Sequence, residues 1–126
     1  MLDSIISHAR DEAPNECCGL LVAAGGLIEQ SIRTTNLEAS PTRYRVDPAQ
    51  HFALIRSLRG TPRHIAGAYH SHPHSSAALS PTDIAEAFDP DLVYLVVSLE
   101  DSERPEVRAY QVRAGAAAEI RLVPEP

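Results

Sequence analysis

An uninterrupted apolar run from residue 92 to 99, Leu-Val-Tyr-Leu-Val-Val-Ser-Leu, constrains the fold more than any other segment of this chain. A strand with one wet face alternates apolar and polar residues, whereas a strand buried on both faces is apolar throughout. The run therefore predicts a central strand that is covered on both sides. A shorter apolar run from residue 65 to 69 predicts a second buried strand.

The other segments predict helices and further strands around this centre. Apolar residues at helical spacing indicate a helix over residues 1–12 that ends before Pro14, and Asp47-Pro48 opens a second helix that Gly60 closes. A Gly25-Gly26 turn between two strand-like segments indicates a hairpin. The further strands are expected at residues 18–24, 27–34, 44–46, 107–112 and 119–123. We expect one α/β (α+β) domain over residues 1–126, with a mixed sheet flanked by helices.

Composition limits the class of protein. A chain of 126 residues buries about two-thirds of its unfolded surface, so it needs neither disulfide nor metal to form a core. The net charge of -6 and the dispersed basic residues, all eleven of them arginines, argue against nucleic acid as a partner. No apolar segment approaches about 18 residues and no signal pattern opens the chain, so we expect no membrane association and a cytoplasmic location. Cys17 and Cys18 are expected to be buried and free of a disulfide.

Two histidines at the end of the 65–69 strand form the first part of a candidate site, in the motif His70-Ser71-His72-Pro73. Residues two apart in a strand point to the same face, so the two imidazoles should lie side by side, about 6.5 to 7 Å apart at Cα. That spacing lets both bind one ion. Pro73 cannot continue a central strand, which indicates that the pair lies at a strand end.

An aspartate follows with ten residues between it and His72, in Ser80-Pro81-Thr82-Asp83. This segment is typical of a helix start, with Ser80 as N-cap, and the positive helix end favours an ionised carboxylate at Asp83. Ser-x-x-Asp alone is an ordinary helix opening, but next to the histidine motif it indicates a third metal ligand. Two histidines and one carboxylate are typical of a catalytic zinc ion with an open position, and Fe(II) in an oxygenase is the alternative metal.

Hydrolysis at such a metal also needs a group that takes up a proton and returns it. Glu16 immediately precedes the strand-like run that begins at Cys17. A glutamate beside a strand is usually solvated, so the pattern alone makes Glu16 a candidate and no more.

The combined pattern resembles the JAMM or MPN-plus (Mov34/PAD-1-like) zinc metalloprotease family, especially its small prokaryotic members that process sulfur carriers. The resemblance rests on Glu16-Cys17-Cys18-Gly19-Leu20-Leu21, the two histidines, Ser80 and Asp83, and it covers nearly the whole chain. It implies one Zn²⁺ ion with a catalytic water, held by His70, His72 and Asp83. It also implies Glu16 as general acid/base and Ser80 as stabiliser of the oxyanion. The implied structure is a cytidine-deaminase-like MPN fold, with a curved sheet and the zinc at one rim.

The resemblance further implies hydrolysis of a peptide or isopeptide bond at the Gly-Gly C-terminus of a ubiquitin-like or sulfur-carrier protein. In that reaction Glu16 deprotonates the zinc-bound water and protonates the departing amine. The short chain favours the sulfur-carrier group, because it has no room for the long insertions of larger deubiquitinating relatives. A zinc peptidase acting on unrelated peptides and a non-catalytic MPN scaffold remain alternatives. His74, just beyond Pro73, is a candidate for contact with substrate, while the substrate protein and the oligomeric state stay open.

Overall fold

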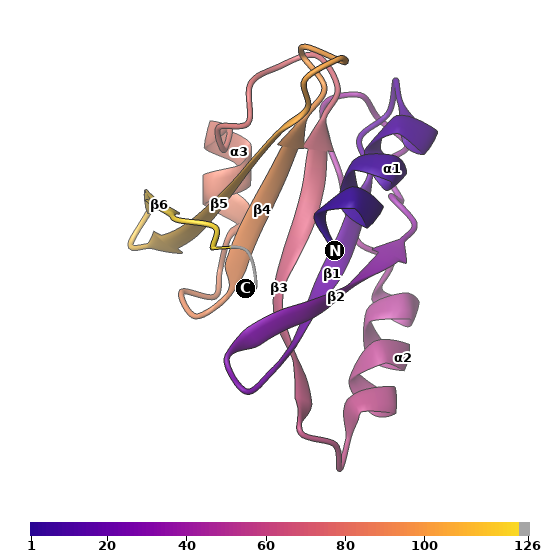
Figure 1. Cartoon of the computed structure of the whole chain (residues 1–126), viewed down its shortest axis with the longest axis vertical. Coiled ribbons are helices and arrows are strands. Elements are labelled where there is room, and N and C mark those ends of the chain that lie inside the picture. The colour runs from indigo at the N-terminus through magenta and orange to yellow at the C-terminus, as the bar shows by residue number, and fades with distance from the viewer. Residues whose placement is uncertain (124–126) are drawn as a thin grey trace.

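The computed structural model describes residues 1–123, which form a six-stranded mixed sheet with three helices (Figure 1). The helices are α1 (Leu2–Glu12), α2 (Pro48–Leu58) and α3 (Pro81–Glu86). The strands are β1 (Cys18–Ala24), β2 (Leu27–Thr34), β3 (Arg63–His72), β4 (Val93–Ser98), β5 (Glu106–Arg113) and β6 (Ala116–Ile120). Within residues 1–123, no helix is both long and apolar enough to cross a membrane.

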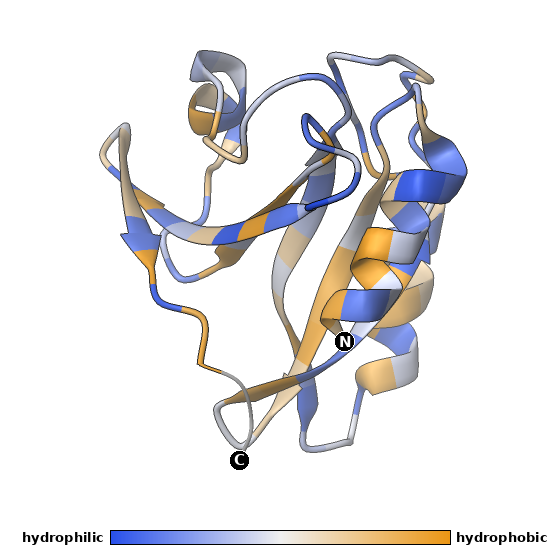
Figure 2. Ribbon diagram, turned by 45° about the horizontal axis from the view of Figure 1, so that its top comes forward, coloured by the Kyte–Doolittle hydropathy of each residue, from blue (hydrophilic) through white to orange (hydrophobic). Residues whose placement is uncertain are grey.

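The strand order places β3 and β4 at the centre of the sheet. The order is β2-β1-β3-β4-β5-β6, in which β3 and β4 run parallel and all other neighbours run antiparallel. Parallel neighbours need a crossover connection, and this one contains α3. The sheet is curved, because β5 and β6 turn away from the direction of β1 to β3 (Figures 1 and 2). The crossover brings the start of α3 next to the end of β3.

Both faces of β4 are buried. On one face, Leu95 and Val97 pack in a cluster that includes Ile5 of α1. On the other face, Val96 packs with Tyr110 and with the loop that follows β3. Hydrophobic residues follow the central strands, and they alternate with hydrophilic residues along α1 (Figure 2). The prediction of a central strand covered on both sides is therefore confirmed.

Several other predicted elements are confirmed as well. Helix α1 ends at Glu12, before Pro14, and the β1–β2 hairpin has the predicted bounds. Its turn residues Gly25 and Gly26 both adopt positive φ, which glycine tolerates without strain. Asp47 caps α2 as expected, since its carboxylate accepts the backbone N–H of Ala49 at 2.9 Å. The single-domain α+β architecture with a curved mixed sheet agrees with the predicted fold class.

The predicted final strand exists, but its predicted bounds of residues 119–123 are wrong. The strand is Ala116–Ile120, because Ala114 and Gly115 both adopt positive φ and turn the chain directly after β5. Positive φ at both central residues is the conformation of a type I′ turn, one of the two common two-residue hairpin turns. As a result, Arg113 pairs with Ala116. Alanine at the first turn position is not a hairpin signal, so the sequence pattern did not reveal this turn.

The predicted short strand at residues 44–46 is also wrong. In this segment only Val46 pairs, through an isolated bridge to Asn36. The side chain of Asn36 accounts for the difference, because its Nδ2 donates to the Arg43 carbonyl at 2.9 Å and its Oδ1 accepts the Arg45 N–H at 3.0 Å. Side-chain hydrogen bonds therefore occupy backbone groups that a strand ladder would use.

A buried hydrogen bond ties α1 to the sheet. His8 Nδ1 lies 2.7 Å from the Tyr69 hydroxyl, and both residues are buried. Tyr69 stands opposite Gly19 on the neighbouring strand, and its ring covers the glycine so closely that any Cβ there would overlap the ring. The missing side chain at Gly19 therefore lets Tyr69 reach across β1 to α1. Burial lowers the pKa of His8, and the positive charge of Arg33 lowers it further.

The buried His8 is expected to make the fold sensitive to mild acid. An unfolded imidazole has a pKa of about 6.5, whereas folded His8 takes up its proton only at lower pH. Below about pH 6.5 the unfolded state therefore binds more protons than the folded state. As the pH is lowered, the free energy of unfolding decreases by at most about 1.4 kcal/mol per pH unit for one proton. Urea denaturation at about pH 7.5 and about pH 5.5 should show a smaller acid-induced loss for His8→Gln than for wild type. Equal losses would contradict this role of His8.

Candidate metal centre

The last residues of β3 bring two imidazoles together. His70 and His72 point to the same side of the strand, and their Nε2 atoms lie 3.2 Å apart. Both side chains are buried, with 1% and 6% of each residue exposed. Strands β1 and β4 hold this end of β3 from either side, because His70 pairs with Cys18 and with Val96. The two imidazoles are thus fixed by the most central part of the sheet.

Asp83 reaches the same point from the first turn of α3. The helix begins with a capping box, in which Ser80 Oγ accepts the Asp83 N–H at 3.0 Å and Asp83 Oδ2 accepts the Ser80 N–H at 2.9 Å. The same Oδ2 lies 3.1 Å from His70 Nε2 and 3.1 Å from His72 Nε2. The cap that starts the helix therefore also aims the carboxylate at the two imidazoles.

The three atoms, Nε2 of His70, Nε2 of His72 and Oδ2 of Asp83, form a triangle of the size that a zinc ion requires. When ligands lie about 2.0–2.1 Å from a tetrahedral ion, neighbouring ligand atoms are about 3.3 Å apart. The measured edges of 3.1, 3.1 and 3.2 Å are close to this value. Two nitrogens and one carboxylate oxygen also match the donor set of a catalytic zinc site. The residues present fit the ion that the sequence resemblance implies.

Burial and hydrogen bonds set the protonation states of His70, His72 and Asp83. His72 Nδ1 lies 2.8 Å from the Ser76 carbonyl, so this nitrogen carries the proton and leaves the Nε2 lone pair facing the triangle. Burial lowers the pKa of His70. Burial alone would raise the pKa of Asp83, but the adjacent His70 and His72 and the Ser80 N–H hold it well below its usual range. Burial lowers the pKa of His72, but the contacts with Asp83 and the Ser76 carbonyl outweigh burial and raise it, so protons would compete with a metal at His72.

Glu16 lies beside the two imidazoles of the triangle. It is 4% exposed and lies just before β1, and a carboxylate oxygen of Glu16 is within 4.8 Å of the histidine ligand atoms. Its Oε1 is buried and has no hydrogen-bond partner among the described residues. Burial raises the pKa of Glu16 to about 7, while positive charge on His72 acts in the opposite direction. A carboxylate with this pKa can both take up and release a proton near neutral pH.

The two cysteines lie apart from this chemistry. Both are buried and neither forms a disulfide. Cys17 packs in the core cluster beneath α1, whereas Cys18 Sγ lies 3.4 Å from Thr34 Oγ1. Burial raises the pKa of the Cys17 thiol to about 12, so Cys17 remains protonated at neutral pH.

All five site residues named from the sequence converge on the end of β3. His70, His72 and Asp83 form the triangle, Glu16 adjoins it, and Ser80 caps the helix that carries Asp83. Their roles as ligands, base and oxyanion donor stay predictions. His74, on the loop after β3, is exposed.

The sequence pattern missed the contacts that support these residues. The Tyr44 ring stacks on the His70 imidazole, with ring centroids 4.2 Å apart and planes 16° apart. Asn36 Nδ2 donates to the Glu16 carbonyl at 3.0 Å, and the Ser76 carbonyl fixes His72. The Tyr44 and Asn36 contacts have no local sequence signal, because each joins segments that only the folded chain brings together, and the contact between Ser76 and His72 depends on the course of the loop after β3.

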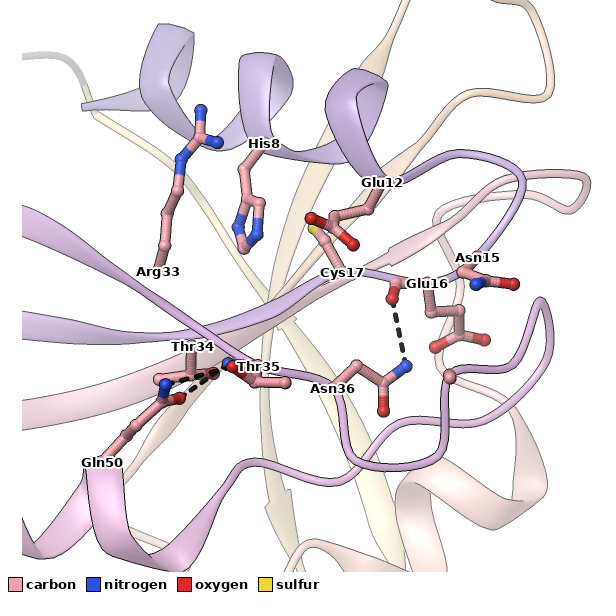
Figure 3. A pocket seen from close by; sticks show the side chains of 11 residues that line it. His8, Glu12, Asn15, Glu16, Cys17, Arg33, Thr34, Thr35, Asn36 and Gln50 are labelled. Atoms are coloured by element: carbon pink, nitrogen blue, oxygen red, sulfur yellow. Dashed lines mark hydrogen bonds between the residues drawn. The ribbon is translucent and has the colours of Figure 1, made fainter.

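A polar pocket of about 450 Å³ lies beside Glu16, on the side of α1 and β2 (Figure 3). Its wall contains both charge signs, from Glu12 and Arg33, and the buried His8. Several of its polar groups are already bonded to one another or to the backbone. Gln50, for example, makes hydrogen bonds of 2.7 and 3.0 Å to the Thr35 N–H and Oγ1.

Comparison with known proteins identifies close sequence relatives. The sequence model described as "Prokaryotic homologs of the JAB domain" matches residues 1–113. The chain is 36% identical to a CysO-cysteine peptidase of Mycobacterium tuberculosis over 121 residues, which are 94% of this chain and 83% of the relative. It is also 34% identical to a desampylase of Haloferax volcanii over 103 residues, 76% of this chain and 74% of the relative.

Solved structures share the fold. A protein of Desulfitobacterium hafniense, DSY2949, matches with a TM-score of 0.87 and 30% identity, over 97% of this chain and 86% of the other. A JAB1/MPN domain protein of Archaeoglobus fulgidus, AF2198, matches with a TM-score of 0.63 and 19% identity, over 96% of this chain and 90% of the other. The latter similarity concerns the fold alone.

Zinc is expected to stabilise the folded protein through the triangle. A ligand that binds only the folded state, at about 100 times its Kd, adds about 2.7 kcal/mol to the free energy of unfolding. Urea denaturation with and without zinc should show this gain in wild type, and a chelator should remove it. Asp83→Asn should lose most of the gain, because it removes a charged ligand but keeps the shape of the cap. The exposed Asp91→Asn serves as control and should keep the gain. An undiminished gain in the Asp83 variant would contradict its assignment as a ligand.

Proposed function

Because the chain belongs to the family of prokaryotic homologs of the JAB domain, we propose that it is a zinc-dependent peptidase that cleaves the C-terminal conjugates of a ubiquitin-like or sulfur-carrier protein. The match spans residues 1–113 and confirms the predicted resemblance to the JAMM/MPN family. Its relatives include a CysO-cysteine peptidase and a desampylase, which supports a peptidase activity.

The observation that carries the proposal is the triangle of ligand atoms with Glu16 beside it. Three atoms at mutual distances of 3.1 to 3.2 Å can hold one ion and leave its remaining position open. The buried Glu16 Oε1, without a partner among the described residues, is an acceptor in need of a donor at this point.

Each residue has a defined part in the proposed hydrolysis. Zinc held by His70, His72 and Asp83 would polarise the scissile carbonyl and lower the pKa of water toward neutrality. Glu16 accepts a proton from the attacking water and delivers it to the amine nitrogen as the C–N bond breaks. The water oxygen remains in the new carboxylate. Ser80 Oγ accepts the Asp83 N–H, which leaves its own O–H free to donate to the carbonyl oxygen during attack.

The proposed substrate is a carrier protein with a Gly-Gly tail that bears an adduct at its terminal carboxyl group. The CysO-cysteine peptidase and the desampylase are the relatives that support this class. A tail of two glycines can approach a buried centre closely, because it brings no side chains with it. We also propose that the protein acts in the cytoplasm and that residues 1–126 form one such domain.

A comparison of Glu16→Gln with His72→Ala tests the proposal. The probe is a Gly-Gly-ending carrier with cysteine joined to its last glycine through a peptide bond, and mass spectrometry measures the released carrier. Wild type should release it. Glu16→Gln should bind zinc stoichiometrically but turn over about 1,000-fold more slowly, since a base handles protons and does not fix the ion. His72→Ala should lose both zinc and activity.

The exposed Glu103→Gln should behave as wild type and serves as the matched control. Full activity in the Glu16 variant would contradict its role as general base. Wild-type cleavage of unrelated peptides at the same rate as the carrier would contradict the proposed substrate class.

A further inference from the structure

Asn36 lies two residues after the end of β2, and its side chain makes the hydrogen bonds that organise the loop facing Glu16. Its side-chain amide uses all of its capacity at once. Nδ2 donates to the carbonyl oxygens of Glu16 and Arg43 at 3.0 and 2.9 Å, and Oδ1 accepts the N–H groups of Glu38 and Arg45 at 3.0 Å each. One side chain therefore folds the loop on itself and joins it to the residue proposed as the base.

The same loop binds Glu16 from the other side of its backbone. The Glu16 N–H donates to the Ser40 carbonyl at 2.8 Å, and the Glu16 carbonyl accepts from Asn36 (Figure 3). Both bonds come from the segment between residues 36 and 40, and the Ala39 N–H donates to the Asn36 carbonyl at 3.2 Å within it. The ladder of β1 begins at Cys18, and Ser71 of β3 holds Cys17, because its Oγ accepts the Cys17 N–H at 2.7 Å and its N–H donates to the Cys17 carbonyl at 3.1 Å. Glu16 lies before both, and the loop bonds its N–H and its carbonyl oxygen.

The side chain of Glu16 is buried, with 4% of the residue exposed, and its Oε1 has no hydrogen-bond partner among the described residues. The position of its backbone therefore contributes to where the carboxylate lies. A general base must stay within hydrogen-bond reach of the proton that it takes, and a displacement of about 1 Å can cost about 100-fold in rate. A shift of the Glu16 backbone would therefore also shift the reacting carboxylate.

We propose that Asn36 is a positioning residue for Glu16, which it serves by closing the loop that clamps the Glu16 backbone at both its N–H and its carbonyl. The expected effect on turnover rests on the proposed function. The hydrogen bonds to the Glu16 backbone do not, because they are a property of the folded chain.

Gln50 offers a matched control. Like Asn36 it is a side-chain amide that ties the segment after β2 to another element, through two bonds to Thr35. It makes no hydrogen bond to Glu16 (Figure 3). Gln50→Ala removes amide hydrogen bonds to Thr35, the residue next to Asn36. Only Asn36→Ala removes a hydrogen bond to Glu16.

The experiment compares Asn36→Ala, Asn36→Asp and Gln50→Ala as zinc-loaded proteins. The aspartate variant keeps the acceptor of Asn36 and loses its two donors, so it tests the clamp if the alanine variant folds poorly. With the cysteine-bearing carrier as substrate, we expect kcat to fall about 10- to 100-fold in both Asn36 variants with KM changed less than about threefold. We expect zinc retention against a competing chelator to stay within about threefold of wild type. Gln50→Ala should keep kcat within about twofold of wild type.

Amide hydrogen exchange at Glu16 gives a readout that needs no turnover. Release of its bond to Ser40 should speed exchange at the Glu16 N–H at least about tenfold in the Asn36 variants, and not in Gln50→Ala. Unchanged exchange at Glu16 would overturn the inference, as would a loss of kcat that is equal in the Asn36 and Gln50 variants. If no variant, wild type included, cleaves the carrier, the proposed function fails, while the exchange result still decides whether Asn36 holds Glu16.

Discussion

The convergence of Asp83 Oδ2 on the Nε2 atoms of His70 and His72 is the interaction on which the rest of the site depends. It joins two elements that are separate in the sequence, the end of β3 and the first turn of α3. The parallel pairing of β3 and β4 requires a crossover between them, and the capping box at Ser80 fixes where the carboxylate points within that crossover. The topology of the sheet and the hydrogen bonds of the helix start thus together place the Asp83 carboxylate beside the two imidazoles.

Burial of several ionisable groups in this arrangement lowers the free energy of unfolding. Two buried imidazoles lie within a few ångströms of both the Asp83 carboxylate and the buried Glu16 at a sheet end. Burial of an unpaired carboxylate disfavours its charged form, which raises the pKa of Glu16, whereas the imidazoles keep Asp83 ionised. Two carboxylates in one small space are thereby separated in function, one suited to bind a cation and the other to exchange a proton.

Local patterns made much of the site predictable. Period-two geometry places His70 and His72 on one face of a strand, and Ser80 with Asp83 forms a capping box that the sequence already indicates. The role suggested for Glu16 came from a family resemblance, since a glutamate before a strand carries no local signal. Likewise, the apolar run at residues 92–99 predicted the centre of the sheet, because an all-apolar strand can only be stable between two covered faces.

Non-local side-chain bonds set the limit of that prediction. Asn36 binds backbone groups of Arg43 and Arg45 and so replaces the short strand expected at residues 44–46, which leaves Tyr44 stacked on His70. The position of β6 depended on positive φ at Ala114, which alanine seldom adopts. In both places a tertiary or backbone preference outweighed the pattern of polar and apolar residues.

The central claim is that two imidazoles and one carboxylate of this chain hold a single zinc ion. X-ray absorption at the zinc edge of the loaded protein tests it most directly, because the signal reports the kind, number and distance of the ligands. The account predicts about four nitrogen and oxygen ligands at about 2.0–2.1 Å, with the outer-shell scattering of two imidazoles and no sulfur. Sulfur at about 2.3 Å, or a six-oxygen shell without imidazole, would contradict it.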